Sequence, residues 1–92
     1  MNRLEGKVAI ITGASGGIGK AAAKLFIEEG ADVLMVDLHE DELTSACNEM
    51  NSNKVSYFVG DVTKASDNLE AVKLATERYG GLDVFIANAG IG

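Results

Sequence analysis

Short runs of apolar residues recur four times along the chain, and Gly, Asp or Asn residues bound them. Within each run the apolar residues are largely continuous rather than strictly alternating, which is typical of parallel strands covered on both faces. The pattern therefore predicts four buried strands. Their expected ranges are Val8–Thr12, Asp32–Asp37, Val55–Gly60 and Leu82–Asn88.

The three segments between these runs carry apolar residues at the spacing of one helix face. Helices are expected over Ile18–Glu29, Glu40–Met50 and Asn68–Tyr79. Gly30 and Gly80 follow the first and third segments, where glycine commonly ends a helix. The expected buried stripes are Ile18, Ala21, Ala22, Leu25 and Phe26, then Leu43, Ala46, Cys47 and Met50, then Leu69, Val72, Ala75 and Tyr79.

The elements alternate as β-α-β-α-β-α-β across 92 residues. Such alternation predicts right-handed crossovers and a parallel sheet with helices on both faces, which is a three-layer α/β arrangement. No linker or low-complexity segment divides the sequence. We expect residues 1–92 to form part of a single domain.

A glycine-rich loop joins the first expected strand to the first helix. Glycine allows sharp turns and the close approach of another molecule, and a helix N-terminus attracts anions. The loop therefore predicts a phosphate-binding site. A Walker-type loop is excluded because the Gly19-Lys20 pair is followed by Ala21 and position 14 is not glycine. The loop glycines are Gly13, Gly16, Gly17 and Gly19.

Asp37 ends the second expected strand, eighteen positions after Gly19. An acidic residue about 20 positions beyond such glycines is placed to accept hydrogen bonds from an adenosine ribose. The same carboxylate would repel a 2′-phosphate, and no Arg or Lys stands at Ser15, Gly16 or Leu38 to offset it. We therefore expect a dinucleotide site that prefers NAD to NADP.

Three motifs resemble those of the short-chain dehydrogenase/reductase family. Thr12–Gly19 (TGASGGIG) resembles the T-G-x-x-x-G-x-G signature, Gly60–Thr63 (GDVT) resembles the segment beside adenine, and Asn88–Gly90 (NAG) resembles the N-N-A-G motif. With these motifs the sequence is similar to the branch of the family that includes 3-oxoacyl-carrier-protein reductases. It implies a partial Rossmann-type sheet with strand order 3-2-1-4, and places residues 1–92 in the N-terminal portion of a dinucleotide-binding domain.

The resemblance also implies roles for individual residues. Thr12 would tie the first turn to the fourth strand. The remaining residues would lie along the pyrophosphate, the two riboses and the adenine. The implied cofactor-binding residues are Gly13, Ser15, Gly16, Gly17, Ile18, Gly19, Asp37, Leu38, Asp61, Val62, Asn88, Ala89 and Gly90.

The sequence departs from the family pattern in two respects. Ala87 stands where the family usually has its first Asn. The family's catalytic Tyr and Lys lie four residues apart, whereas Tyr57 is followed by Asp61 and Tyr79 by Asp83. We therefore expect a cofactor-binding segment of an NAD(P)-dependent oxidoreductase without catalytic residues. The loop also fits the T-G-x-x-G-x-x-G pattern of the extended, epimerase-like branch, which stays an alternative.

Charge and composition narrow the expected partners. The net charge of −6 argues against binding to nucleic acid or to an anionic membrane. One cysteine, Cys47, allows no internal disulfide, and the first residues lack the apolar core of a signal peptide, so a cytoplasmic location is expected. The last expected strand is apolar and uncharged from Val84, which predicts self-association through its edge. The alternative function is a non-catalytic, self-associating fragment or an NAD-binding module.

Overall fold

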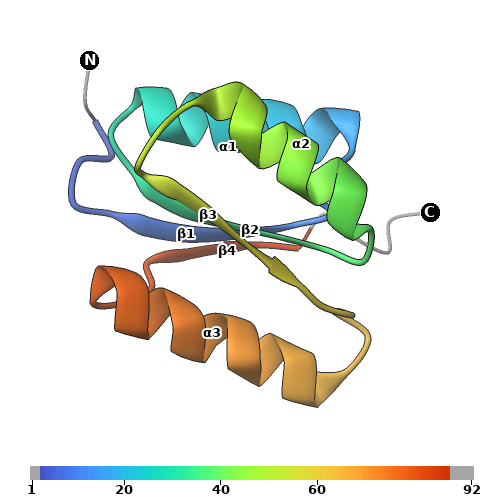
Figure 1. Cartoon of the computed structure of the whole chain (residues 1–92). Helices are drawn as coiled ribbons and strands as arrows, with labels where there is room; N and C mark the ends of the chain where they lie inside the picture. The colour runs from blue at the N-terminus through green and yellow to red at the C-terminus, as the bar shows by residue number, and fades with distance from the viewer. Residues whose placement is uncertain (1–2, 88–92) are drawn as a thin grey trace.

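The computed structural model describes residues 3–87, and the alternation of strands and helices is the one that the sequence predicts (Figure 1). Three elements differ from expectation in length, and the first helix begins and ends one residue early, at Gly17 and Glu28. The third strand ends one residue early, at Val59. The third helix begins three residues early, and the fourth strand has only three residues. The elements are β1 (Val8–Thr12), α1 (Gly17–Glu28), β2 (Asp32–Asp37), α2 (Glu40–Met50), β3 (Val55–Val59), α3 (Ala65–Tyr79) and β4 (Val84–Ile86).

The four strands form one parallel sheet in the order β3-β2-β1-β4. This confirms the expected α/β sheet of Rossmann type. Thr12 at the end of β1 pairs with Val36, and Asp37 at the end of β2 pairs with Val59. The carboxyl ends of β1, β2 and β3 therefore lie side by side at one edge of the sheet. From β1 the chain adds β2 and then β3 on one side, and it then places β4 on the other side of β1. Ligands of such folds bind at the carboxyl edge, next to the point where the strand order changes direction.

Helices cover both faces of the sheet (Figure 1). Helices α1 and α2 lie on one face and α3 lies on the other, which gives three layers. Successive residues of β1 and β2 point to opposite faces, so each strand contributes to two separate cores. The core beneath α1 and α2 contains Ala9, Ile11, Val33, Met35, Ala23, Leu43 and Ala46, and the core above α3 contains Val8, Ile10, Leu34, Val36, Ala71 and Ala75.

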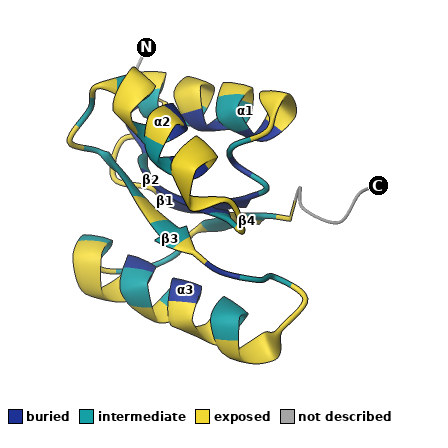
Figure 2. Ribbon diagram, turned by 45° about the vertical axis from the view of Figure 1, so that its right-hand side comes forward, coloured by how far each residue is buried: buried dark blue, intermediate teal, exposed yellow. Residues whose placement is uncertain are grey.

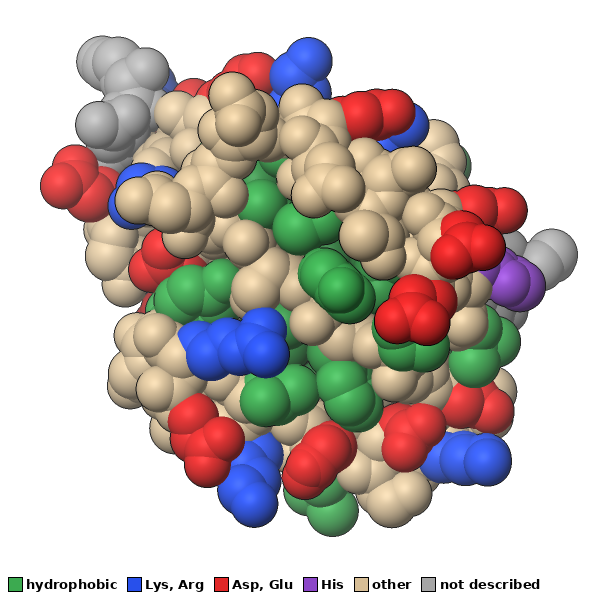
Figure 3. Space-filling model, viewed as in Figure 1, with side chains coloured by type: hydrophobic (Ala, Val, Ile, Leu, Met, Phe, Trp, Pro, Cys, Tyr) green, Lys and Arg blue, Asp and Glu red, His purple; other side chains and the backbone are tan. Residues whose placement is uncertain are grey.

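The prediction that all four strands are buried is wrong for the two edge strands. β1 is buried throughout and β2 along its middle four residues, whereas β3 and β4 are only partly covered (Figure 2). Figure 3 shows hydrophobic side chains at the surface between the helices of the two faces, and β3 contributes the exposed Tyr57 and Val59. An apolar run gives no sign of whether its strand lies in the middle or at an edge.

The predicted buried stripe of α1 is displaced by one residue. Ile18 is 78% exposed and Leu25 is 55% exposed, although both were expected in the core. The face that contacts the sheet consists of Gly19, Ala22, Ala23, Phe26 and Ile27, so the predictions for Ala22 and Phe26 are confirmed. The spacing is the expected one, and only its phase differs.

The other two helices pack more nearly as predicted. In α2, Leu43 and Ala46 are buried, and Cys47 and Met50 pack against them. In α3, Ala75 is buried as expected, but Leu69 is 70% exposed and Ala71 takes its place in the core.

Candidate functional site

The glycine-rich loop turns sharply at the carboxyl end of β1. Gly13 has a φ of +63°, a backbone conformation that favours glycine. Its carbonyl oxygen accepts a hydrogen bond from the Gly16 amide at 3.2 Å, which closes the turn. The Ala14 amide donates to the Val36 carbonyl at 3.2 Å and attaches the loop to β2. The loop therefore leads directly into α1 at the sheet edge.

The four loop glycines differ in why glycine is needed. A Cβ on Gly19 would overlap the Gly13 carbonyl and lie 2.8 Å from the Ala14 Cα, so the fold itself requires glycine there. A Cβ on Gly17 would meet no atom within 4 Å, and one on Gly16 would make only an ordinary contact of 3.5 Å with the Gly13 oxygen. The fold leaves open space at Gly17 and would tolerate a side-chain carbon at Gly16, beside the start of α1.

The N-terminus of α1 is suited to an anion. Gly16 is the N-cap residue and offers no side chain to the first amides, and the first turn contains no acidic residue. The amides of a first helical turn lack partners within the helix, and the helix dipole places positive potential there. Helix α2 differs, because Glu40, Asp41 and Glu42 occupy its first turn.

Asp37 lies beside this loop and is held by four donors. Its Oδ2 accepts hydrogen bonds from the Ser15 amide at 3.1 Å and the Ser15 hydroxyl at 2.6 Å. Its Oδ1 accepts from the Leu38 amide at 2.7 Å and the His39 amide at 3.4 Å. Burial raises the pKa of Asp37, but the hydrogen bonds from Ser15, Leu38 and His39 outweigh it and hold the pKa below its usual value. Asp37 is therefore a fixed, charged acceptor at the sheet edge.

Asp61 and Val62 continue the same edge after β3. The Gly60 amide donates to the Asp37 carbonyl at 3.0 Å, which brings the two strand ends together. The Asp61 Oδ1 accepts from both the amide and the hydroxyl of Thr63, at 2.9 and 2.6 Å. These bonds from Thr63 lower the pKa of Asp61. The Asp61 amide donates to Asp67 at 2.8 Å, so both ends of this loop are fixed.

The structure thus brings together most of the residues that the sequence singles out. The Thr12 hydroxyl donates to the Ile86 carbonyl at 3.3 Å, so β1 is tied to β4 as expected. Ile18 and Leu38 are exposed beside the loop and beside Asp37, at 78% and 58%. The remaining predicted residues, Asn88, Ala89 and Gly90, lie outside the described residues.

Several positioning residues were missed by the sequence analysis. The link between Ser15 and Asp37 is not among the predictions, although a short polar side chain in a glycine-rich loop is a suitable partner for an aspartate. The roles of Thr63 and Asp67 are not among them either. The Asp-x-Thr spacing at Asp61 could have revealed the role of Thr63, because Asp side chains commonly accept hydrogen bonds from groups two positions ahead.

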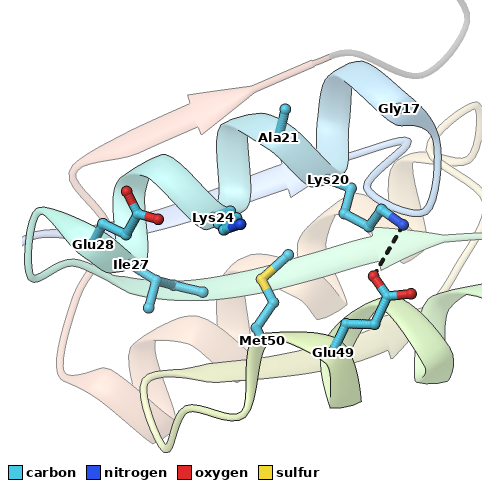
Figure 4. Close-up of a pocket in the computed structure, with 8 residues that line it drawn as sticks. All are labelled: Gly17, Lys20, Ala21, Lys24, Ile27, Glu28, Glu49 and Met50. Carbon is cyan, nitrogen blue, oxygen red and sulfur yellow. Dashed lines mark hydrogen bonds and ion pairs between the residues drawn. The ribbon is translucent and has the colours of Figure 1, made fainter.

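A pocket of about 330 Å³ lies between α1 and α2 (Figure 4). Lys20 and Glu49 form an ion pair across it at 3.1 Å, with exposed fractions of 40% and 62%. Such an exposed pair contributes little to stability. No residue of a strand, or of the loops after β2 and β3, lines this pocket. Gly17 is the one lining residue that also belongs to the candidate site, so the pocket adjoins that site at the start of α1. Its lining residues are Gly17, Lys20, Ala21, Lys24, Ile27, Glu28, Glu49 and Met50.

Residues 3–87 also bear on metal binding and on membrane insertion. In that range, no three His, Cys, Asp or Glu residues form a group that could hold a metal ion. None of the described helices has the length and apolar character needed to cross a membrane. Cys47 is half-buried, and burial raises the pKa of its thiol, which does not favour a reactive thiolate.

Proteins of known sequence are similar to this chain. The chain is 43% identical over 89 residues to short-chain dehydrogenase reductase 3a of Arabidopsis thaliana, covering 97% of this chain and 35% of that protein. It is 45% identical over 91 residues to a mitochondrial borneol dehydrogenase of Lavandula x intermedia, covering 99% of this chain and 34% of that protein. The chain therefore spans about a third of the length of the curated relatives it matches.

Solved structures and a family model agree with these relatives. A short chain dehydrogenase from Mycobacterium smegmatis superposes with a TM-score of 0.91 at 35% identity, covering all of this chain and 40% of that one. A 3-ketoacyl-(acyl-carrier-protein) reductase from Brucella melitensis complexed with NADH has a TM-score of 0.83 at 35% identity, covering 89% and 33%. The model of the short chain dehydrogenase family matches residues 7–92. The chain belongs to the short-chain dehydrogenase family.

Proposed function

We propose that this chain is the cofactor-binding portion of an NAD(P)-dependent short-chain oxidoreductase, and that a nicotinamide dinucleotide binds along the carboxyl edge of its sheet. The observation that carries this proposal is that the fold itself does not require glycine at Gly16 or Gly17, and that the space at Gly17 is open. Neither glycine is required by its own backbone angle or by neighbouring atoms, yet both border an uncapped helix N-terminus. A phosphate group that approaches the backbone closely is a physical reason for glycine there.

The residues at this edge fit such a cofactor. The amides at the start of α1, after Gly16, would hold the pyrophosphate. Asp37 would accept hydrogen bonds from the adenosine ribose, and Leu38 would offer an exposed apolar surface beside it. Asp61 and Val62 would border the adenine. The sequence also carries Asn88, Ala89 and Gly90 for the nicotinamide side, by resemblance to the family motif.

The same residues support a preference for NAD over NADP. Asp37 carries a negative charge close to where a 2′-phosphate would lie, and its lowered pKa keeps it charged at neutral pH. The first turn of α2 adds the carboxylates of Glu40, Asp41 and Glu42 just beyond it. These carboxylates oppose the binding of a 2′-phosphate because like charges repel one another.

The bound cofactor would carry the hydride between an alcohol and a carbonyl, and the protein would hold and orient it. The family's Tyr-x-x-x-Lys pair does not occur within the 92 residues. We therefore propose that the 92-residue chain by itself binds cofactor but has no dehydrogenase turnover. Reduction of NAD that tracks with the purified 92-residue protein would contradict this part of the proposal.

Calorimetric titration of the purified chain with NAD and with NADP tests the binding proposal. We expect heat of binding for NAD and weaker binding for NADP. Equal affinities would show that the assignment of Asp37 is wrong. Absence of binding to both cofactors, in a chain whose circular dichroism shows it to be folded, would overturn the proposed function itself.

A second function, self-association, is favoured by the exposed edge of β4. Within residues 3–87, β4 pairs only with β1, and no strand lies along its other side. Phe85 in this strand is 41% exposed. An edge strand offers unpaired amide and carbonyl groups to another chain, and a two-fold dimer is the simplest result. We propose that the 92-residue chain dimerises through this edge.

The proposed compartment is the cytoplasm. Cys47 is a free thiol in the structure, as the single cysteine requires, and reducing compartments favour free thiols. A fluorescent fusion of the chain, expressed in its native cell, would test the assignment by its distribution.

A further inference from the structure

The hydrogen bonds around the Asp37 carboxylate use all of its acceptor positions. A carboxylate offers about four lone-pair positions, two on each oxygen. On Oδ2 both are taken by Ser15, through its amide at 3.1 Å and its hydroxyl at 2.6 Å. On Oδ1 they are taken by the Leu38 amide at 2.7 Å and, more weakly, the His39 amide at 3.4 Å. The carboxylate has no strong acceptor position left on Oδ2.

A ribose with two neighbouring hydroxyl groups presents two further donors to this carboxylate. Three of the four existing donors are backbone amides, which cannot leave without movement of the chain. The Ser15 hydroxyl is different, because rotation about the Cα–Cβ bond is enough to remove it. It is therefore the donor that a ribose hydroxyl can replace at the lowest cost.

We propose that the Ser15 hydroxyl is a placeholder: in the ligand-free protein it occupies the acceptor position on Asp37 Oδ2 that the adenosine ribose takes, and it rotates away when a dinucleotide binds. The inference rests on the proposed function, because it assumes that a dinucleotide binds at this edge. It assigns Ser15 as a positioning residue that acts through Asp37.

The rest of the loop explains why the exchange needs no backbone movement. The Ser15 amide still bonds to Asp37, and the Ala14 amide still bonds to the Val36 carbonyl at 3.2 Å. Two links between the loop and β2 therefore persist after the hydroxyl leaves. Oδ1 also keeps its bonds to the Leu38 and His39 amides, so the carboxylate stays in the orientation that the ribose requires.

The exchange is measured by NMR titration of the Asp37 carboxyl carbon, with and without saturating NAD. The unmutated chain is compared with Ser15→Ala and with Ser45→Ala, a matched change on α2 next to the same surface. In the free protein, Ser15→Ala should raise the pKa of Asp37, because a donor to its charged form is lost. In the NAD complex Ser15→Ala should leave this pKa unchanged, because the hydroxyl has already left. Ser45→Ala should change neither value.

A second readout at neutral pH is the Ser15 χ1 angle, from three-bond couplings in the unmutated chain. We expect the rotamer to change when NAD is added. An unchanged rotamer, or an equal rise of the Asp37 pKa with and without NAD, would show that the hydroxyl stays on Asp37 and would overturn this inference alone. If NAD at millimolar concentration moves no resonance of the folded chain, the proposed function fails and this inference fails with it.

Discussion

Val8 and Asp83, 75 positions apart in the sequence, are joined by two hydrogen bonds. The Val8 amide donates to the Asp83 carboxylate at 2.9 Å, and the Asp83 amide donates to the Val8 carbonyl at 2.9 Å. The first bond satisfies an amide at the start of a buried strand, and the second begins the pairing of β1 with β4. Asp83 therefore fixes where the last strand enters the sheet.

Replacing Asp83 tests this link. Asp83→Ala leaves the Val8 amide without its acceptor, so we expect a loss of about 1.5 kcal/mol in the free energy of unfolding. Asp83→Asn keeps an acceptor oxygen and should lose less. Urea denaturation followed by circular dichroism measures both. If Ala and Asn give the same stability as the unmutated chain, the side chain does not hold the strand.

Gly17 and Gly19 should respond to the same substitution in opposite ways. Gly17→Ala meets no atom and reduces the freedom of the unfolded chain, so stability should rise by about 0.4–1 kcal/mol. Gly19→Ala would overlap the backbone of Gly13 and Ala14, and should cost about 1–3 kcal/mol. Thermal and urea unfolding of the two variants provides the comparison.

Gly17→Ala should also weaken the binding of NAD, although it stabilises the fold. A methyl group placed beside the first amides of α1 obstructs close approach of a phosphate. We expect a loss of about tenfold in affinity, which is about 1.4 kcal/mol, measured by calorimetry. A variant that is more stable and binds NAD unchanged would show that the open space at Gly17 does not serve the ligand.

Asp37→Ala should weaken NAD binding and relax discrimination against NADP. Loss of a hydrogen bond to a charged acceptor is worth about 1.5–3 kcal/mol, which corresponds to a factor of about 10–150 in affinity. Asp41→Ala is the matched control, because it removes the same charge from the exposed first turn of α2. Calorimetry should show a much smaller loss of NAD affinity for Asp41→Ala than for Asp37→Ala. Equal effects would mean that only the overall charge matters.

The lowered pKa of Asp37 predicts how stability depends on pH. A carboxyl group with a lower pKa in the folded state stabilises the fold above its unfolded pKa of about 4, and this contribution is lost as the pH falls through the folded pKa. Asp37→Asn lacks this contribution. The gap in urea midpoint between the unmutated chain and Asp37→Asn should therefore narrow as the pH falls from 7 to 3. A gap that stays constant would contradict the assignment.

Self-association through β4 is tested by Phe85→Lys. A lysine on the exposed edge strand should disfavour pairing with another chain. Sedimentation velocity across a concentration series should show a dimer or larger species for the unmutated chain and a monomer for the variant. Leu69→Lys is the matched control, because Leu69 is an exposed apolar residue on α3. A folded, unmutated chain that is monomeric at every concentration would exclude the proposed interface.

The sequence by itself determined the order and type of the elements, the parallel sheet, the family and most of the candidate site. These follow from local signals: continuous apolar runs, helical spacing, loop glycines, and an aspartate at the end of a strand. Helix α2 has its predicted bounds, and Asp37 lies beside the glycine-rich loop as its spacing indicates. Signals of this kind depend on a few neighbouring residues and need no knowledge of distant contacts.

Only the tertiary structure decided which face of α1 is buried and which strands lie at the edges. In α1 the stripe that begins at Ile18 and the stripe that begins at Gly19 both have helical spacing. The second is buried because Gly19 must lie against the Gly13 backbone, where no side chain fits. Likewise, the placement of β3 and β4 at the edges and the bond from Ser15 to Asp37 depend on packing between segments far apart in the sequence.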